Sequence, residues 1–219
     1  GVVHLNLDPG LGMRGDGVAI VPLDLPGVSR GAPLNKLGQR PLNQGEIFFD
    51  DVRLPEKYMI IPDAAVGTLM KDLILIYANT GMGVLFTGLA QAAFDEALHY
   101  AKNRIQGGKP IFDHQSVRLR LFEMFKMVET SRALTRRVAS YNISNNPMHG
   151  GIPSGAHGMA LKVYATEIAF KVASEALQIF GGIGLSKDYP IEKMFRDARA
   201  SMIEDGENNV LSLVGASHL

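Results

Sequence analysis

Three carboxylates and a glycine lie together near the end of the chain, in the stretch Glu204-Asp205-Gly206-Glu207. A carboxylate beside a glycine on a short turn can point into a cleft, because glycine leaves space next to the backbone. A carboxylate held away from water is a suitable general base for a weakly acidic proton. The stretch therefore predicts a proton-abstraction site. It would equally suit a plain helix N-terminus, where the helix dipole favours negative charge.

A second candidate site lies at Gln178-Ile179-Phe180-Gly181-Gly182, where a long amphipathic run stops at two glycines. Glycines that follow a helix let backbone amides approach a ligand closely, because no Cβ stands in the way. We therefore expect this segment to hold an anionic cofactor. The alternative is a helix C-cap without a ligand, which would use the same glycines.

Helices must position both sites, because the hydrophobic spacing becomes helical after about residue 64. The pattern predicts helices over about 65–105, 113–141, 154–180 and 190–200, and a last one that begins near Gly206. Asp113 and Ser154 are suitable N-caps. The first helix has an apolar stripe that includes Met70 and Ile74, and small residues at Gly81, Gly83, Gly88 and Ala90 that suit close helix crossing. The fold class is therefore mainly α, a helical bundle.

Residues 1–60 have a different composition, rich in glycine, proline and β-branched residues. Segments 18–23 and 46–52 read as strands bounded by turn residues. These strands are too few for an independent sheet domain. The chain also lacks an initiating methionine and opens in what reads as a strand, so we expect a piece of a longer protein. The predicted domains are a partial β-domain over 1–60 and a four-helix bundle over 61–219.

Composition argues against several function classes. The formal net charge is zero, so we expect no nucleic-acid partner. The absence of cysteine excludes thiolate chemistry and fits an intracellular setting, for which we expect the cytoplasm. The six histidines show no metal-ligand spacing, so no metal site is predicted. Asn79 interrupts the richest apolar run, Leu73–Tyr77, so we expect no membrane span.

One glycine motif has the wrong context. Residues 10–15 match G-x-G-x-x-G, but a strand follows them where a dinucleotide-binding unit needs a helix. We therefore expect a hairpin loop at this position.

Several short motifs occur in order along the whole chain: Asp24-Leu25-Pro26-Gly27, Lys36-Leu37-Gly38-Gln39-Arg40, Phe49-Asp50-Asp51-Val52, Gly88-Leu89-Ala90-Gln91, Gly108-Lys109-Pro110-Ile111, Gln178-Ile179-Phe180-Gly181-Gly182 and Arg196-Asp197-Ala198-Arg199. Together they resemble the acyl-CoA dehydrogenases, from the second half of the middle β-domain to the end of the C-terminal helical domain. Each motif is short, but the ordered series is specific.

The resemblance implies an FAD cofactor, an acyl-CoA substrate and an electron-transfer flavoprotein as acceptor. It also implies a homo-oligomer, a dimer or a tetramer built from dimers, in which the helical domain reaches over a partner's cofactor. The residues it places around FAD are Arg104, Gln115, Gln178, Gly181, Gly182 and Asn209. Arg104 would meet pyrophosphate oxygens through charge-assisted hydrogen bonds. Taken alone, Arg104 would read as a solvated cation at a helix end.

The family has a Tyr-Glu-Gly-Thr element, and the resemblance places Asp205 at its catalytic base and Glu204 at its tyrosine. The implied reaction is α,β-dehydrogenation of an acyl-CoA thioester. Four positions depart from the family pattern. Ala78 and Asn79 stand where some relatives have an alternative base followed by an arginine. Gly107 replaces an aromatic residue, and Glu207 replaces a threonine that usually contacts the flavin phosphate.

These departures leave three hypotheses open. The chain is the C-terminal part of a flavin-dependent dehydrogenase, a non-catalytic paralogous subunit, or a helical oligomerisation module without flavin turnover. In each case we expect the 219-residue piece alone to be inactive.

Overall fold

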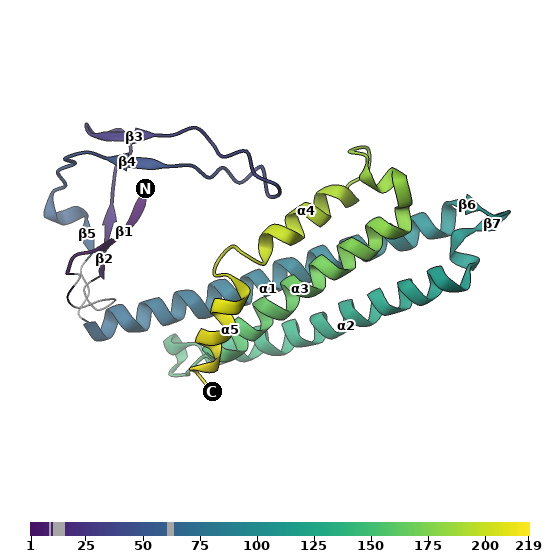
Figure 1. The fold of residues 1–219 in the computed structure, drawn as a ribbon. Helices are drawn as coiled ribbons and strands as arrows, with labels where there is room; N and C mark the ends of the chain where they lie inside the picture. The colour runs from purple at the N-terminus through teal and green to yellow at the C-terminus, as the bar shows by residue number, and fades with distance from the viewer. Residues whose placement is uncertain (9, 11–15, 61–63) are drawn as a thin grey trace. The chain divides into compact units, whose positions relative to one another are not determined.

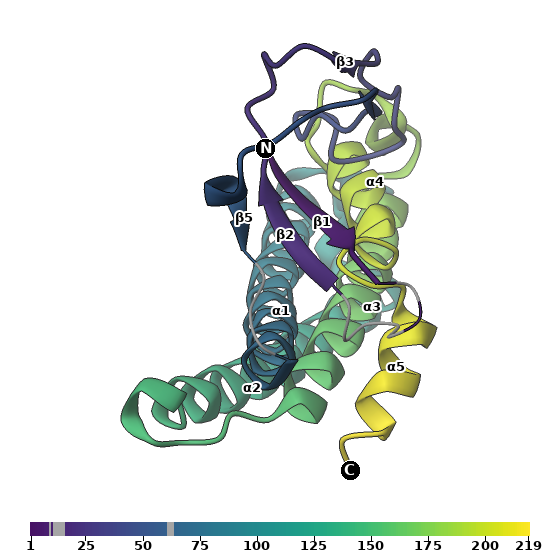
Figure 2. The same ribbon diagram turned by 90° about the vertical axis from the view of Figure 1, so that its left-hand side faces the viewer.

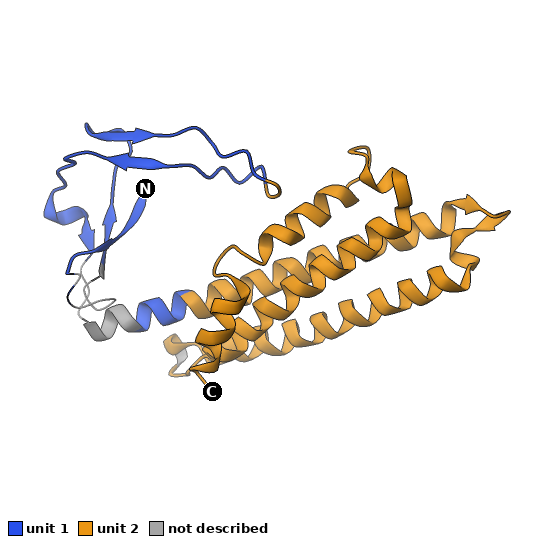
Figure 3. Ribbon diagram, in the orientation of Figure 1, with its two compact units in different colours: residues 1–36, 40–74 blue, residues 37–39, 75–219 orange. Residues whose placement is uncertain are grey.

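The structure is a computed structural model that describes residues 1–8, 10, 16–60 and 64–219. Two compact units make up the chain, residues 1–36 with 40–74 and residues 37–39 with 75–219 (Figure 3). The domain boundary near residue 60 stays a prediction. Most of the glycine motif at 10–15 lies outside the described residues.

The first unit contains short antiparallel strands. β1 (Val2–Asn6), β2 (Asp16–Ile20) and β5 (Met59–Ile60) form one sheet in the order β1-β2-β5. β3 (Val28–Arg30) pairs with β4 (Ile47–Phe49), and η2 (Glu56–Tyr58) precedes β5. The side chains of β4 are all exposed. Both predicted strands exist, but they are shorter than 18–23 and 46–52.

The second unit is a helical bundle (Figures 1 and 2). Its long helices are α1 (Ala64–Asn103), which starts in the first unit, α2 (Gln115–Ser144) and α3 (Gly155–Phe180), and its shorter helices are α4 (Ile191–Ser201) and α5 (Asn208–Ala216). β6 (Ile105–Gln106) and β7 (Lys109–Pro110) form a hairpin between α1 and α2, with η3 (Ile111–Asp113) after it. η4 (Pro147–His149) precedes α3, and η5 (Gly181–Leu185) follows it. The mainly helical fold class is confirmed.

α3 is central to this unit because it packs against α2, α4 and α5. Its buried positions recur at helical spacing, so one stripe of the helix faces the core. Ser154 caps its start, since the side chain accepts a hydrogen bond from the His157 amide. Gly181 ends it with a φ of +67°. Both ends of α3 are thus fixed where the sequence indicates.

Two details differ from the sequence-based expectation. Asp113 is not the N-cap of α2: it lies in η3, and His114 holds the cap position, with a side chain that does not cap the helix. On α1, Met70 and Ile74 are exposed, and the buried side is formed by Ile76, Asn79, Thr80, Gly83 and Phe86. Between Leu69 and Ile76, apolar residues occur on the exposed as well as the buried side of α1, so the spacing alone did not identify the buried face.

Two segments have the length and hydropathy of a membrane span, Leu69–Asn103 and Gly155–Leu185. Neither segment was expected from the sequence, because a high average hydropathy needs no uninterrupted apolar run. Core helices of globular proteins pass the same test, and 44% of each apolar window is buried within the structure. The absence of a membrane span stays a prediction.

Candidate functional site

A cleft of about 940 Å³ lies in the second unit, where the end of α1, the β6–β7 hairpin, the start of α2 and the end of α3 come together. Tyr100 and Phe180 stack at a centroid distance of 4.2 Å, and Tyr189 packs edge-on against Phe180 at 5.3 Å. All three rings line the cleft. These aromatic contacts hold the end of α3 against the end of α1.

Glycines at the cleft keep the backbone accessible. Gly181 has φ +67° and ψ −146°, a conformation that side-chain-bearing residues rarely adopt. A Cβ added at Gly181 or Gly182 would meet no atom within 4 Å, so the space beside both is open. Gly107 and Gly108 have φ +64° and +77° and form the two-residue turn of the hairpin. The cleft therefore has open backbone along two of its edges.

The cleft carries positive charge. Arg104 lines it and is exposed, and its guanidinium has no acidic partner within the ranges that the structure describes. Arg120 also lines the cleft, but its Nη1 is 2.5 Å from Oε2 of Glu175. The Arg104 guanidinium is therefore available to an anion, which it can contact through charge-assisted hydrogen bonds.

The acidic turn, residues 204–207, joins α4 to α5. Asp205 has φ +49°, a left-handed conformation that is uncommon for a residue with a side chain, although aspartate adopts it more readily than most. Asp205 is exposed, and its carboxylate makes no hydrogen bond in the described part of the chain. The other two carboxylates of the turn are engaged in hydrogen bonds.

Glu207 caps α5. Its Oε2 accepts hydrogen bonds from the backbone amides of Asn209 at 2.9 Å and Val210 at 3.1 Å. These hydrogen bonds lower the pKa of the Glu207 carboxyl below its usual value, because they favour the charged form. Glu207 therefore has a structural role in this chain.

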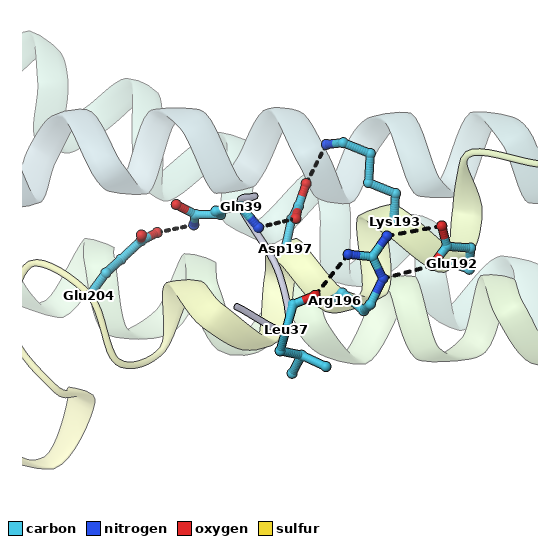
Figure 4. Close-up of polar contacts among 7 residues, drawn as sticks. All are labelled: Leu37, Gln39, Glu192, Lys193, Arg196, Asp197 and Glu204. Atoms are coloured by element: carbon cyan, nitrogen blue, oxygen red, sulfur yellow. Dashed lines mark hydrogen bonds and ion pairs between the residues drawn. The ribbon is translucent and has the colours of Figure 1, made fainter. Parts of the chain in front are cut away.

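Glu204 is held by residues 37–39, which we call the strap. The Gln39 side-chain amide donates to Oε1 of Glu204, and the Gln39 backbone amide donates to Oδ1 of Asp197 at 2.5 Å. Arg196 donates to the Leu37 carbonyl at 2.8 Å. Figure 4 shows these contacts together, with Lys193 and Glu192 completing the ion pairs on α4. The strap thus connects α4 to the acidic turn.

The structure brings four of the predicted cofactor residues to the cleft: Arg104, Gln178, Gly181 and Gly182. Gln115 is exposed at the start of α2, and only its neighbours His114, Ser116 and Val117 line the cleft. Asn209 lies in the first turn of α5, where its Nδ2 donates to Oε1 of Glu207 at 2.9 Å.

The cleft and the acidic turn lie at different places along α3. Lys162 contacts the turn and Gln178 lines the cleft, and these two residues are 16 positions apart in the helix. At 1.5 Å per residue, that separation is about 24 Å. Asp205 and Asn209 therefore do not join the other predicted residues in one site of a single chain.

The structure shows what surrounds Asn79 and Gly107, two of the residues that depart from the family pattern. Asn79 is 1% exposed; its Nδ2 donates to the Leu75 carbonyl at 2.8 Å, while its Oδ1 has no hydrogen-bond partner among the residues that the structure describes. Gly107 lies in the cleft, and a Cβ added there would be 3.3 Å from the His114 ring. No group of metal-ligating side chains occurs among the residues searched, which are those that the structure describes.

Sequence reasoning missed a buried polar group beneath the acidic turn. Lys162 is fully buried, and so is its neighbour Thr166; Asn208 is 5% exposed. One signal was available: Lys162 falls on the same helical stripe as Met159, Ala165 and Ala169, where a lysine interrupts an otherwise apolar face.

Comparisons with known proteins agree with the fold. A family described as "Acyl-CoA dehydrogenase, C-terminal domain" matches residues 77–219. An acyl-CoA dehydrogenase from Bacillus subtilis is 31% identical over 211 residues, which are 96% of this chain and 54% of that protein. The chain spans about half the length of the curated relatives it matches.

Solved structures give the same result. Butyryl-CoA dehydrogenase from Megasphaera elsdenii superposes with a TM-score of 0.88 at 29% identity, over 99% of this chain and 55% of that one. A structure described as "PigA with FAD and proline" has a TM-score of 0.87 at 24% identity, over 99% of this chain and 55% of that one; this match supports the fold alone.

Proposed function

Because this chain belongs to the acyl-CoA dehydrogenase family, we propose that it is the C-terminal part of a flavin-dependent enzyme. The enzyme would oxidise an acyl-CoA thioester to its α,β-unsaturated product. The observation that carries the proposal is the cleft, which combines open glycine backbone with the exposed Arg104, an arginine without an acidic partner in the described part of the chain. The 219-residue piece alone would be inactive, since it spans about half of its relatives.

The residues of the cleft fit the anionic part of FAD. Arg104 would bind a pyrophosphate oxygen, and the open space beside Gly181 and Gly182 would admit the cofactor close to the backbone. Gln178 would donate a hydrogen bond from its amide. When bound, FAD accepts the hydride that leaves the β-carbon of the substrate.

Asp205 is the proposed base, which takes the proton from the α-carbon of the thioester. Glu204 and Glu207 are less suitable because both carboxylates are already hydrogen-bonded, Glu204 to Gln39 and Glu207 to the α5 amides. Asp205 is exposed in this chain, so the substrate and the rest of the protein would have to exclude water from its carboxylate. Aspartate reaches one methylene less far than glutamate, which favours a substrate held close to the turn.

The distance along α3 between the cleft and the acidic turn supports an oligomer. If the cleft of one chain holds a cofactor, its own acidic turn lies about 24 Å away along the helix and would serve another active site. A homodimer or a tetramer built from dimers would satisfy this arrangement. An electron-transfer flavoprotein is the proposed electron acceptor.

A non-catalytic paralogous subunit is the second candidate. Glu207 favours it, because a carboxylate repels a cofactor phosphate where the family has threonine. Asn79 favours it as well, since it takes the place of a family arginine. The third candidate, a helical oligomerisation module without flavin, predicts a purified full-length protein without flavin absorbance.

One experiment separates these candidates. The full-length protein is purified, its FAD content is measured by absorbance, and turnover of acyl-CoA thioesters is followed with an artificial electron acceptor. FAD with turnover supports the dehydrogenase. FAD without turnover supports the non-catalytic subunit, and absence of FAD supports the oligomerisation module.

A further inference from the structure

Lys162 is the most unusual buried group in the bundle. Its side chain is 0% exposed in the middle of α3. A buried ammonium group needs close polar partners, because removing it from water is otherwise strongly unfavourable. Lys162 Nζ donates to the Gly206 carbonyl oxygen at 2.6 Å and to Oδ1 of Asn208 at 3.0 Å. Both acceptors lie on or beside the acidic turn.

Asn208 makes this connection more rigid. It is 5% exposed, and its Nδ2 donates to the Thr166 hydroxyl at 3.1 Å. Thr166 follows Lys162 by four residues on α3, so the two side chains lie on the same helix face. One face of α3 therefore holds Asn208 at both its amide oxygen and its amide nitrogen.

The acidic turn is consequently fixed on both sides of Asp205. Glu204 before it is bonded to Gln39, and the Gly206 carbonyl after it is bonded to Lys162. Asp205 itself has a φ of +49° and no hydrogen bond to its carboxylate in the described part of the chain. The surroundings thus set the backbone at Asp205 and leave its side chain available.

We propose that Lys162 is a positioning residue for Asp205, acting through the Gly206 carbonyl that it holds. This inference rests on the proposed function of Asp205 as the base. A base must lie within hydrogen-bond reach of the proton it removes, and a displacement of about 1 Å can reduce the rate about a hundredfold. Lys162 keeps the peptide that follows Asp205 in place, so that the carboxylate meets the α-carbon.

Electrostatics support the same assignment. Burial lowers the pKa of the Lys162 ammonium, whereas the carboxylates of Glu204, Asp205 and Glu207 act in the opposite direction. A positive charge beneath three carboxylates reduces their mutual repulsion and lets them share one short turn.

The test uses the full-length enzyme with the Lys162→Met variant, which keeps most of the length of the side chain and removes its donors. Lys171→Met, on the exposed side of the same helix, is the matched control. We expect Lys162→Met to retain FAD and to lower kcat about a hundredfold with little change in KM, because positioning acts on the chemical step. Unchanged kcat in the folded, FAD-loaded variant would overturn the proposal.

A pair of milder variants covers the case in which Lys162→Met does not fold. Thr166→Val removes the hydroxyl that holds Asn208, and Thr166→Ser keeps it. We expect about a tenfold loss of kcat in Thr166→Val and wild-type activity in Thr166→Ser, because only the first removes the hydrogen bond that orients Asn208. Equal kcat in both variants would refute the positioning role.

A double variant distinguishes this inference from the proposed function. If Lys162 acts through Asp205, adding Lys162→Met to Asp205→Asn lowers turnover no further, because the two residues act as a unit. A further independent loss in the double variant contradicts the positioning role. If Asp205→Asn alone keeps full turnover, the proposed function fails, and this inference fails with it.

Discussion

Replacing Gly38 with alanine should detach the strap from α4. Gly38 is buried, and a Cβ built on it would lie 2.3 Å from the Arg196 carbonyl oxygen and 2.6 Å from the Arg196 carbonyl carbon. Both atoms belong to the backbone of a helix, so no flexible side chain can move aside. The strap itself must therefore shift, and its hydrogen bonds to Asp197 and Glu204 must lengthen or break.

The expected cost follows from those bonds. The Gln39 amide bonds to the Asp197 carboxylate at 2.5 Å, and Arg196 bonds to the Leu37 carbonyl at 2.8 Å. A hydrogen bond to a charged group contributes about 1.5–3 kcal/mol. Asp197 is buried and keeps its ion pair with Lys193, and Arg196 keeps Glu192, so part of the loss is offset. We expect Gly38→Ala to lower the free energy of unfolding by about 2–3 kcal/mol.

Denaturant unfolding of the full-length protein measures this loss, and hydrogen exchange at residues 204–207 reports whether the acidic turn is released. Gly31→Ala is the control, because the nearest atom to its added Cβ would be the Glu46 Cβ at 3.5 Å, an ordinary contact. We expect the control to change stability by less than about 0.5 kcal/mol. Equal stability of the Gly38→Ala and Gly31→Ala proteins would refute the reasoning.

Three further predictions concern packing, pH and the cofactor. A Cβ at Gly83 would lie 2.3 Å from the buried Leu161 Cγ, whereas a Cβ at Gly81 meets nothing within 4 Å. The gain in helix propensity is the same for both, so the Gly83→Ala protein should be less stable than the Gly81→Ala protein by about 1–3 kcal/mol in thermal unfolding. Equal melting temperatures of the two variants would contradict this. The pKa of Glu207 is lowered on folding, so its ionised carboxylate stabilises the protein above pH 4.5, and this contribution is lost as the pH falls through the folded pKa. The difference in unfolding free energy between wild type and Glu207→Gln should therefore shrink in acid. A difference that is constant from neutral to acidic pH would refute this role of Glu207. Arg104→Met should weaken FAD binding about tenfold or more in fluorescence titration while Arg118→Met, on the exposed side of α2, leaves it unchanged; identical affinities would exclude Arg104 as a cofactor contact.

The helices and their ends could be predicted because local signals determine them. Ser154 caps α3, and Gly181 ends it in a conformation that glycine adopts readily. These signals depend only on neighbouring residues. The grouping of Arg104 with Gln178, Gly181 and Gly182 was instead implied by the family resemblance, because no local signal relates residues so far apart in the sequence.

The contacts between distant segments could not be predicted. Gln39 bonds to Glu204 across 165 residues, and Lys162 bonds to Gly206 across 44 residues. Neither pair leaves a periodic pattern in the sequence, because each contact depends on how the helices pack. The predicted buried face of α1 was wrong for a related reason. Asn79 and Gly83 are buried while Ile74 is exposed, and Gly83 lies directly against Leu161 of α3, so close packing outweighs hydrophobicity there.

The central claim is that Asp205 is the base of an acyl-CoA dehydrogenase. The most direct test compares the full-length wild-type and Asp205→Asn proteins for FAD content and for turnover of an acyl-CoA thioester. We predict that Asp205→Asn keeps its FAD and loses turnover by a factor of about 10²–10⁴, the usual contribution of a general base. Turnover by the FAD-loaded variant at the wild-type rate would contradict the claim.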